Sequence, residues 1–105
     1  MTKKDFLESY AECVQRIRLK EQQSEGKWIP DRLCAEIAEL EARRQQVLAA
    51  IETARRPVAR VILESRYING LTFEQTARRV GYDPSNVSRI LQKAMKEMVF
   101  PAGVV

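Results

Sequence analysis

Four polar residues of types that contact DNA bases lie close together near the carboxyl-terminal end of this 105-residue chain: Ser85, Asn86, Ser88 and Arg89. They fall in the first turns of an expected helix, whose apolar residues Val87, Ile90 and Leu91 suit its inward face. The polar residues should therefore face outward. In the DNA major groove, an Asn amide pairs with adenine and an Arg guanidinium with guanine, each through two hydrogen bonds. The spacing predicts a base-reading face, in which Asn86 and Arg89 contact bases and the two serines orient the helix.

Four basic residues flank this face where the phosphates of a bound duplex would pass: Arg78, Arg79, Lys93 and Lys96. Such side chains hold the DNA backbone in place without reading its sequence. Residues 55–96 contain nine Arg and Lys against three acidic residues, a net charge of +6, whereas residues 25–56 are neutral overall. A basic cluster confined to one segment predicts a polyanionic partner, double-stranded DNA. An incidental cationic surface is the alternative.

The composition counts against catalysis and metal binding. The chain has no His, which removes the imidazole base and the imidazole ligand. Cys13 and Cys34 are isolated, so we expect two reduced, buried thiols and no zinc site. No nucleophile–base pair, carboxylate dyad or glycine-rich phosphate loop is visible in the sequence. The sequence predicts no enzyme, no metal and no cofactor.

The segments that hold the basic and polar residues have clear helix boundaries. Thr72 and Gln75 have the spacing of a capping box before a short helix over residues 73–80, and Gly81 suits its end. Asp83 suits the N-cap of the next helix, with Pro84 as its first residue. Two short capped helices joined by a three-residue turn predict a helix-turn-helix motif. A purely structural corner between two helices is the alternative.

A further helix should precede this motif. It is expected to begin at Pro57 and to stop at the Asn69–Gly70 turn. The residues expected on its inward face are Val58, Val61, Ile62 and Tyr67. Together with the two capped helices it would form a three-helix head over residues 57–100, followed by a short tail, residues 101–105.

The amino-terminal half has the spacing of two long helices. Residues 2–23 carry an apolar stripe of Phe6, Tyr10, Cys13 and Ile17. From residue 31 a seven-residue repeat places Leu33, Ile37, Leu40, Val47, Ile51 and Ala54 on one face, with Arg44 as its one polar residue. A break over residues 24–30 contains Gly26 and Pro30. We expect an antiparallel coiled-coil hairpin over residues 1–56, serving oligomerisation or partner binding. The expected fold class is therefore all-α.

The chain has no pattern typical of export or membrane insertion. Its first residues are charged and lack the apolar core of a signal peptide. The longest uninterrupted apolar run, Val47 to Ile51, is far shorter than the roughly 20 residues of a membrane span. The sequence predicts a soluble cytoplasmic protein with no membrane partner.

The carboxyl-terminal half also resembles a known family. The resemblance rests on the run from Arg66 to Ala77, on Val80-Gly81-Tyr82, on Val87-Ser88-Arg89-Ile90 and on Lys93-Ala94-Met95. These residues look like region 4 of bacterial sigma-70-type factors, and the resemblance covers about residues 57–98. In that family, region 4 binds the −35 promoter element and the flap of RNA polymerase. With its coiled-coil-like first half, the chain is similar to the small region 4-like proteins of phages and prophages, which include the ArpU and RinA types of late-gene activator.

The resemblance has two departures that bear on function. Pro84, Ser85 and Asn86 stand where primary sigma factors usually have charged residues, so the preferred DNA need not be a −35 hexamer. The chain has no room for region 2, which melts promoter DNA, so a complete sigma factor is not expected. The sequence predicts a DNA-binding transcription regulator, a phage or prophage late-gene activator in a bacterial host cell, with host RNA polymerase or a second copy as further partners. The alternatives are a small terminase-like DNA-packaging subunit and a polymerase-binding adaptor that binds no DNA.

Overall fold

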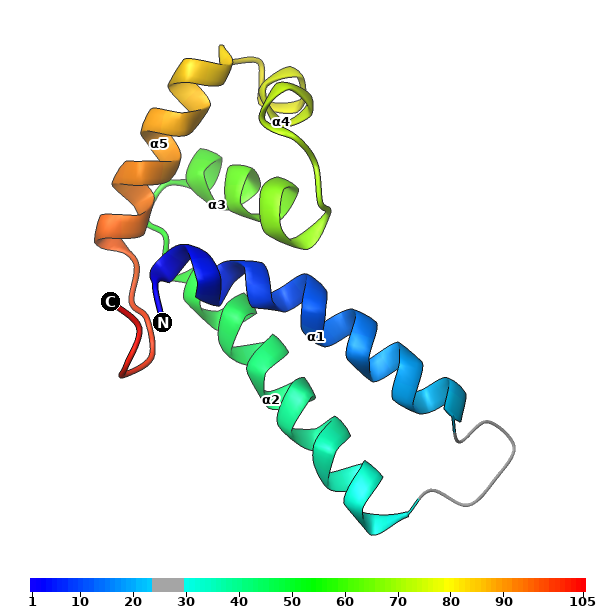
Figure 1. Ribbon diagram of the computed structural model, residues 1–105. Helices are drawn as coiled ribbons and strands as arrows, with labels where there is room; N and C mark the ends of the chain where they lie inside the picture. Colours follow the sequence, from blue (N-terminus) through cyan, green and yellow to red (C-terminus); the bar gives the residue numbers. More distant parts are fainter. Residues whose placement is uncertain (24–29) are drawn as a thin grey trace.

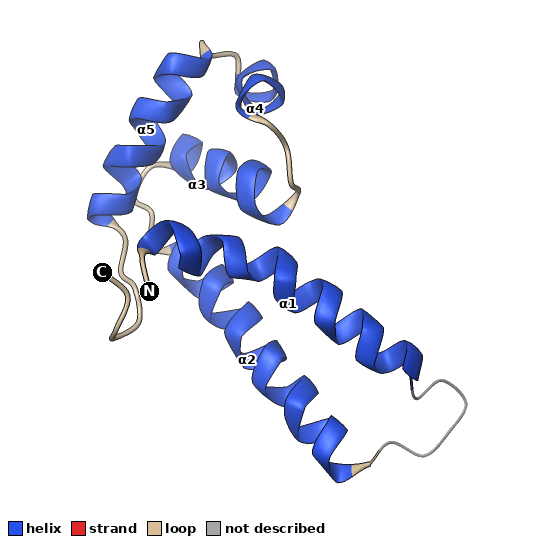
Figure 2. Ribbon diagram, in the orientation of Figure 1, coloured by secondary structure: helices blue, strands red, loops and turns tan. Residues whose placement is uncertain are grey.

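A computed structural model describes residues 1–23 and 30–105, and every regular element in these residues is helical (Figures 1 and 2). In chain order the elements are α1 (Lys3–Gln23), α2 (Asp31–Glu52), α3 (Pro57–Leu63), a π-helical turn η1 (Glu64–Ile68), α4 (Phe73–Val80) and α5 (Pro84–Glu97). The prediction of an all-helical fold is confirmed. The break predicted over residues 24–30 lies outside the described residues except for Pro30. None of the described helices is both long and apolar enough to cross a lipid bilayer.

The two long helices α1 and α2 lie side by side and run in opposite directions (Figure 1). Their apolar stripes are buried unequally. Val47 and Ile51 are buried near the end that adjoins the other helices, whereas Leu33, Ile37 and Leu40 are only half-buried toward the far end. The distal half of the hairpin is less well covered, because two helices alone cannot surround each other's apolar faces.

A hydrophobic core joins the hairpin to the helices that follow it. Phe6 and Leu7 of α1 are fully buried in the same cluster as Ile62 of α3 and Val87 of α5. The rings of Phe6 and Phe100 meet edge to face, with centroids 5.8 Å apart. The tail also contributes, since the Lys3 amide donates to the Val105 carbonyl over 3.1 Å. The chain ends consequently lie next to each other at the junction (Figure 1).

The inward face of α3 differs from the predicted one. Its buried residues are Ala59, Ile62 and Leu63, whereas Val61 is 39% exposed. At about 100° per residue, a face centred on those three positions places Val61 on the opposite side of the helix. The helix then continues into η1, which buries Ser65 and Tyr67. The prediction for Tyr67 is confirmed and that for Val61 is wrong.

The two cysteines also differ from each other. Cys13 is buried between α1 and α2, but Cys34 is exposed on α2. Residue 34 directly follows the stripe position Leu33, so the helical rotation turns it away from α1. The expectation of two buried thiols is correct for Cys13 and wrong for Cys34. Burial raises the pKa of the Cys13 thiol, which favours its protonated form.

Candidate nucleic-acid interface

The first helix of the candidate interface, α4, begins with a complete capping box. The Thr72 hydroxyl accepts a hydrogen bond from the Gln75 amide over 3.1 Å. In return, the Gln75 side-chain oxygen accepts one from the Thr72 amide over 3.0 Å. These two bonds satisfy amide groups that a helix start otherwise leaves without a partner. The predicted capping box is confirmed, and it sets where α4 begins.

A left-handed residue ends α4 and redirects the chain into α5. Gly81 has a φ of 78°, a conformation that other residues adopt only with strain. Its amide donates to the Ala77 carbonyl over 2.8 Å, and the Tyr82 amide donates to the same oxygen over 3.1 Å. Asp83 then occupies the N-cap position in extended geometry, but its side chain makes no capping hydrogen bond. The predicted turn is confirmed, whereas the capping role of the Asp83 carboxylate is not observed.

The two helices pack through small and apolar side chains, so that α5 lies along one edge of the head (Figure 1). Ala77 of α4 is buried at this contact, and the buried residues of α5 are Val87, Leu91 and Ala94. A small residue lets two helices approach closely where they cross. One side of α5 is therefore packed in the core, and the opposite side is exposed to solvent.

The solvent side of α5 brings the sequence-predicted residues together along 14 residues of helix. Its exposed members are Ser85, Asn86, Arg89, Lys93 and Lys96. Ser88 is half-buried, which limits its reach toward a ligand. The polar residues stand in the first two turns and the lysines in the following ones. Along the helix, the amide, hydroxyl and guanidinium groups therefore come before the two ammonium groups.

Arg78 and Arg79 on α4 are exposed, but their surroundings differ. Arg78 and Asn86 line the same surface hollow, to which Glu74 and Asp83 also contribute. The guanidinium of Arg79 donates to the Ser65 hydroxyl over 3.3 Å. Arg78 is thus beside Asn86 with two acidic neighbours, whereas Arg79 is anchored to η1.

Two arginines that are not among the predicted DNA-contacting residues lie next to α5. Arg55 and Arg56, between α2 and α3, line a small hollow together with Lys93. They extend the positive charge of Lys93 onto the linker between the hairpin and α3, and Glu97 adds one acidic group to the same hollow. The signal that could have found them is the charge count over residues 55–96, which includes both.

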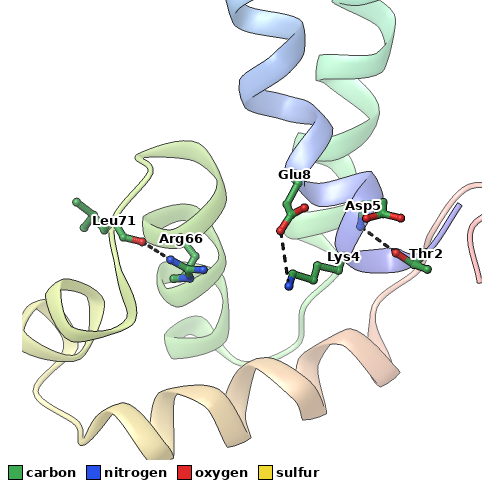
Figure 3. Close-up of polar contacts among 6 residues, drawn as sticks. All are labelled: Thr2, Lys4, Asp5, Glu8, Arg66 and Leu71. Atoms are coloured by element: carbon green, nitrogen blue, oxygen red, sulfur yellow. Dashed lines mark hydrogen bonds and ion pairs between the residues drawn. The ribbon is translucent and has the colours of Figure 1, made fainter.

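Arg66 belongs to the same basic segment but serves the fold. Its guanidinium donates to the Leu71 carbonyl over 2.6 Å, a contact drawn in Figure 3. The same group lies over the Phe73 ring at 4.2 Å from its centroid. These contacts tie η1 to the start of α4. Burial raises the pKa of the neighbouring Tyr67, and the charge of Arg66 partly opposes that shift.

Within residues 1–23 and 30–105, no group of three or more Cys, Asp or Glu side chains is arranged to hold a metal ion. No protein-family model, curated protein or solved structure matches the chain significantly. The resemblance to sigma region 4 therefore depends on the residue pattern alone.

Proposed function

We propose that the protein is a transcription regulator that binds specific sequences of double-stranded DNA by inserting α5 into the major groove. The observation that carries this proposal is the composition of the solvent side of α5. Asn86 and Arg89 stand exposed in its first turns, on a helix positioned by Gly81 and by the buried Ala77 contact. In helix-turn-helix proteins, the residues at the start of the second helix contact base edges.

The basic residues around α5 support a phosphate-binding role. Lys93 and Lys96 continue the exposed side of the helix, and Arg55 and Arg56 lie beside Lys93. A helix of 14 residues is about 21 Å long, which exceeds the roughly 12 Å width of the major groove. When the first turns reach bases, the later turns pass the phosphate backbone. The two groups of residues would then act at the same time.

The finer role that we propose is activation of late genes of a phage or prophage, with contact to host RNA polymerase. It is supported by the resemblance of about residues 57–98 to sigma region 4, which in that family binds both the promoter and RNA polymerase. The proposal includes no enzymatic activity and no cofactor.

The deciding experiment is selection of bound duplexes from a random DNA pool by the full chain, carried out at two salt concentrations. We expect one enriched motif at both concentrations, and an affinity that falls steeply as salt rises. Each neutralised phosphate should contribute about −0.9 to the log–log salt slope. Binding without any enriched motif would contradict sequence-specific recognition. Absence of duplex binding at low salt, together with retained binding to RNA polymerase, would favour the adaptor instead.

A further inference from the structure

A groove runs along the hairpin between α1 and α2, from Met1 near the junction with the head to Gln23 and Glu36 toward the far end. Its volume is about 660 Å³, and Cys13 and Leu40 provide apolar lining. Leu19, about one turn before the end of α1, lies on the same groove and is 58% exposed. The groove therefore offers both an apolar hollow and an apolar projection on one surface.

The charged residues of this groove are balanced, in contrast to the head. Three acidic and three basic residues line it: Glu12, Arg16, Lys20, Glu36, Glu39 and Arg43. Glu12 and Arg16 form an ion pair at 2.6 Å, and Lys20 bridges to Glu36 on α2 at 2.7 Å. The Lys20 ammonium also lowers the pKa of the Glu36 carboxyl below its ordinary value. A surface with equal numbers of acidic and basic groups is unsuited to a polyanion such as DNA.

The residues that α1 contributes to the groove are arranged symmetrically around Arg16. Glu12 lies four residues before Arg16 and Lys20 four residues after it, so an acid and a base hold equivalent positions. Cys13 and Leu19, both apolar, lie three residues to either side. A second copy facing the first in antiparallel orientation would therefore oppose Glu12 to Lys20 and the Leu19 projection to the hollow at Cys13.

The groove residues of α2 are also arranged symmetrically about a midpoint. Glu36 and Arg43 lie equally far from a midpoint between Glu39 and Leu40, and they also have opposite charges. The Lys20–Glu36 ion pair shows that these two residues lie at the same height along the antiparallel helices. Because the helices are antiparallel, moving four residues from Lys20 toward the start of α1 and four residues from Glu36 toward the end of α2 reaches Arg16 and Leu40, which therefore lie at the same height along the hairpin. One two-fold axis across the groove can therefore relate both helices.

We propose that a second copy of this chain docks on the groove, so that two hairpins form an antiparallel four-helix bundle around that axis. A two-fold interface uses the same patch on both copies and must be self-complementary, as this one is in the placement of its charged residues. The half-buried Leu33, Ile37 and Leu40 extend toward the same distal half. The two Arg16 side chains would meet near the axis, and each Glu12 carboxylate would lie between its own Arg16 and Lys20 of the other copy.

The first test compares Leu19→Glu with the matched control Ala11→Glu in the full chain. Both substitutions place a carboxylate at an exposed position of α1, but residue 11 does not line the groove. Sedimentation equilibrium without DNA should give a dimer for the parent and the control, and a dissociation constant at least tenfold higher for Leu19→Glu. Circular dichroism checks that all three proteins are folded. A monomeric parent, or a Leu19→Glu dimer of unchanged affinity, would overturn the proposal.

The second test uses two charge reversals, Glu12→Lys and Lys20→Glu. Each variant alone opposes like charges across the axis and should dissociate, whereas an equimolar mixture opposes unlike charges and should dimerise again. Failure of the mixture to associate would rule out the antiparallel register. Assembly of the parent into a ring of eight or more chains would contradict the two-fold dimer and favour the terminase-like alternative. Because the mass is measured without DNA, none of these results depends on the proposed DNA-binding function.

Discussion

Arg89 and Lys93 are exposed on the same side of α5, yet we expect their removal to have different effects on DNA binding. Loss of a bidentate base contact in Arg89→Ala should cost about 1–3 kcal/mol on the preferred site and little on other DNA. Lys93→Ala should weaken binding to all sequences about equally and make the log–log salt slope shallower by about one. Competition between specific and scrambled duplexes measures the ratio of affinities. A folded Arg89→Ala variant with the parental ratio would refute the assignment of the reading residues.

Arg66 should behave as a structural residue, in spite of its charge. In Arg66→Ala, the Leu71 carbonyl loses its charged donor and the Phe73 ring loses its cationic neighbour. We expect a loss of about 2 kcal/mol in the free energy of unfolding, measured by urea denaturation. Arg56→Ala is the control, because that side chain is exposed and should affect DNA affinity rather than stability. Equal stability of the two variants would contradict this division of roles.

At the scale of single elements, the start of α4 depends on the capping box. Thr72→Ala removes the acceptor for the Gln75 amide and should lower the free energy of unfolding by about 1 kcal/mol. Thr72→Ser keeps a hydroxyl at the same place and should retain most of the stability. Urea denaturation of both variants provides the measurement. If serine proves as destabilising as alanine, the hydroxyl is not the stabilising group.

At the scale of the whole molecule, the shared core should make the hairpin and the head unfold together. Phe6 is fully buried against both parts, although it lies on α1 and far from α5 in sequence. Phe6→Ala should cost about 3–5 kcal/mol and lower the thermal stability of the head as well. Hydrogen exchange of the amides in α5 reports on the head separately. Unchanged protection of α5 in the variant would show that the two parts are independent.

The register of the helices and their ends could be predicted because they depend on neighbours in the sequence. Thr72 and Gln75 are three residues apart, Gly81 acts on its own turn, and the spacing of Val87 and Leu91 defines the side of α5 that faces away from Asn86. Such short-range signals determined the all-helical class, the bounds of α4 and the composition of the candidate reading face.

Only the tertiary structure decided which charged and apolar residues meet across elements. The sequence by itself determined that residues 55–96 are strongly basic. It did not determine that Arg66 stabilises the fold through the Leu71 carbonyl, or that Arg55 and Arg56 lie beside Lys93. Likewise, the apolar stripes of α1 and α2 could be predicted, whereas the groove between these helices and the contact between Phe6 and Phe100 could not. The physical reason is that these features depend on contacts between distant parts of the chain. A local period specifies which side of a helix is apolar, and the packing of all the helices specifies what covers it.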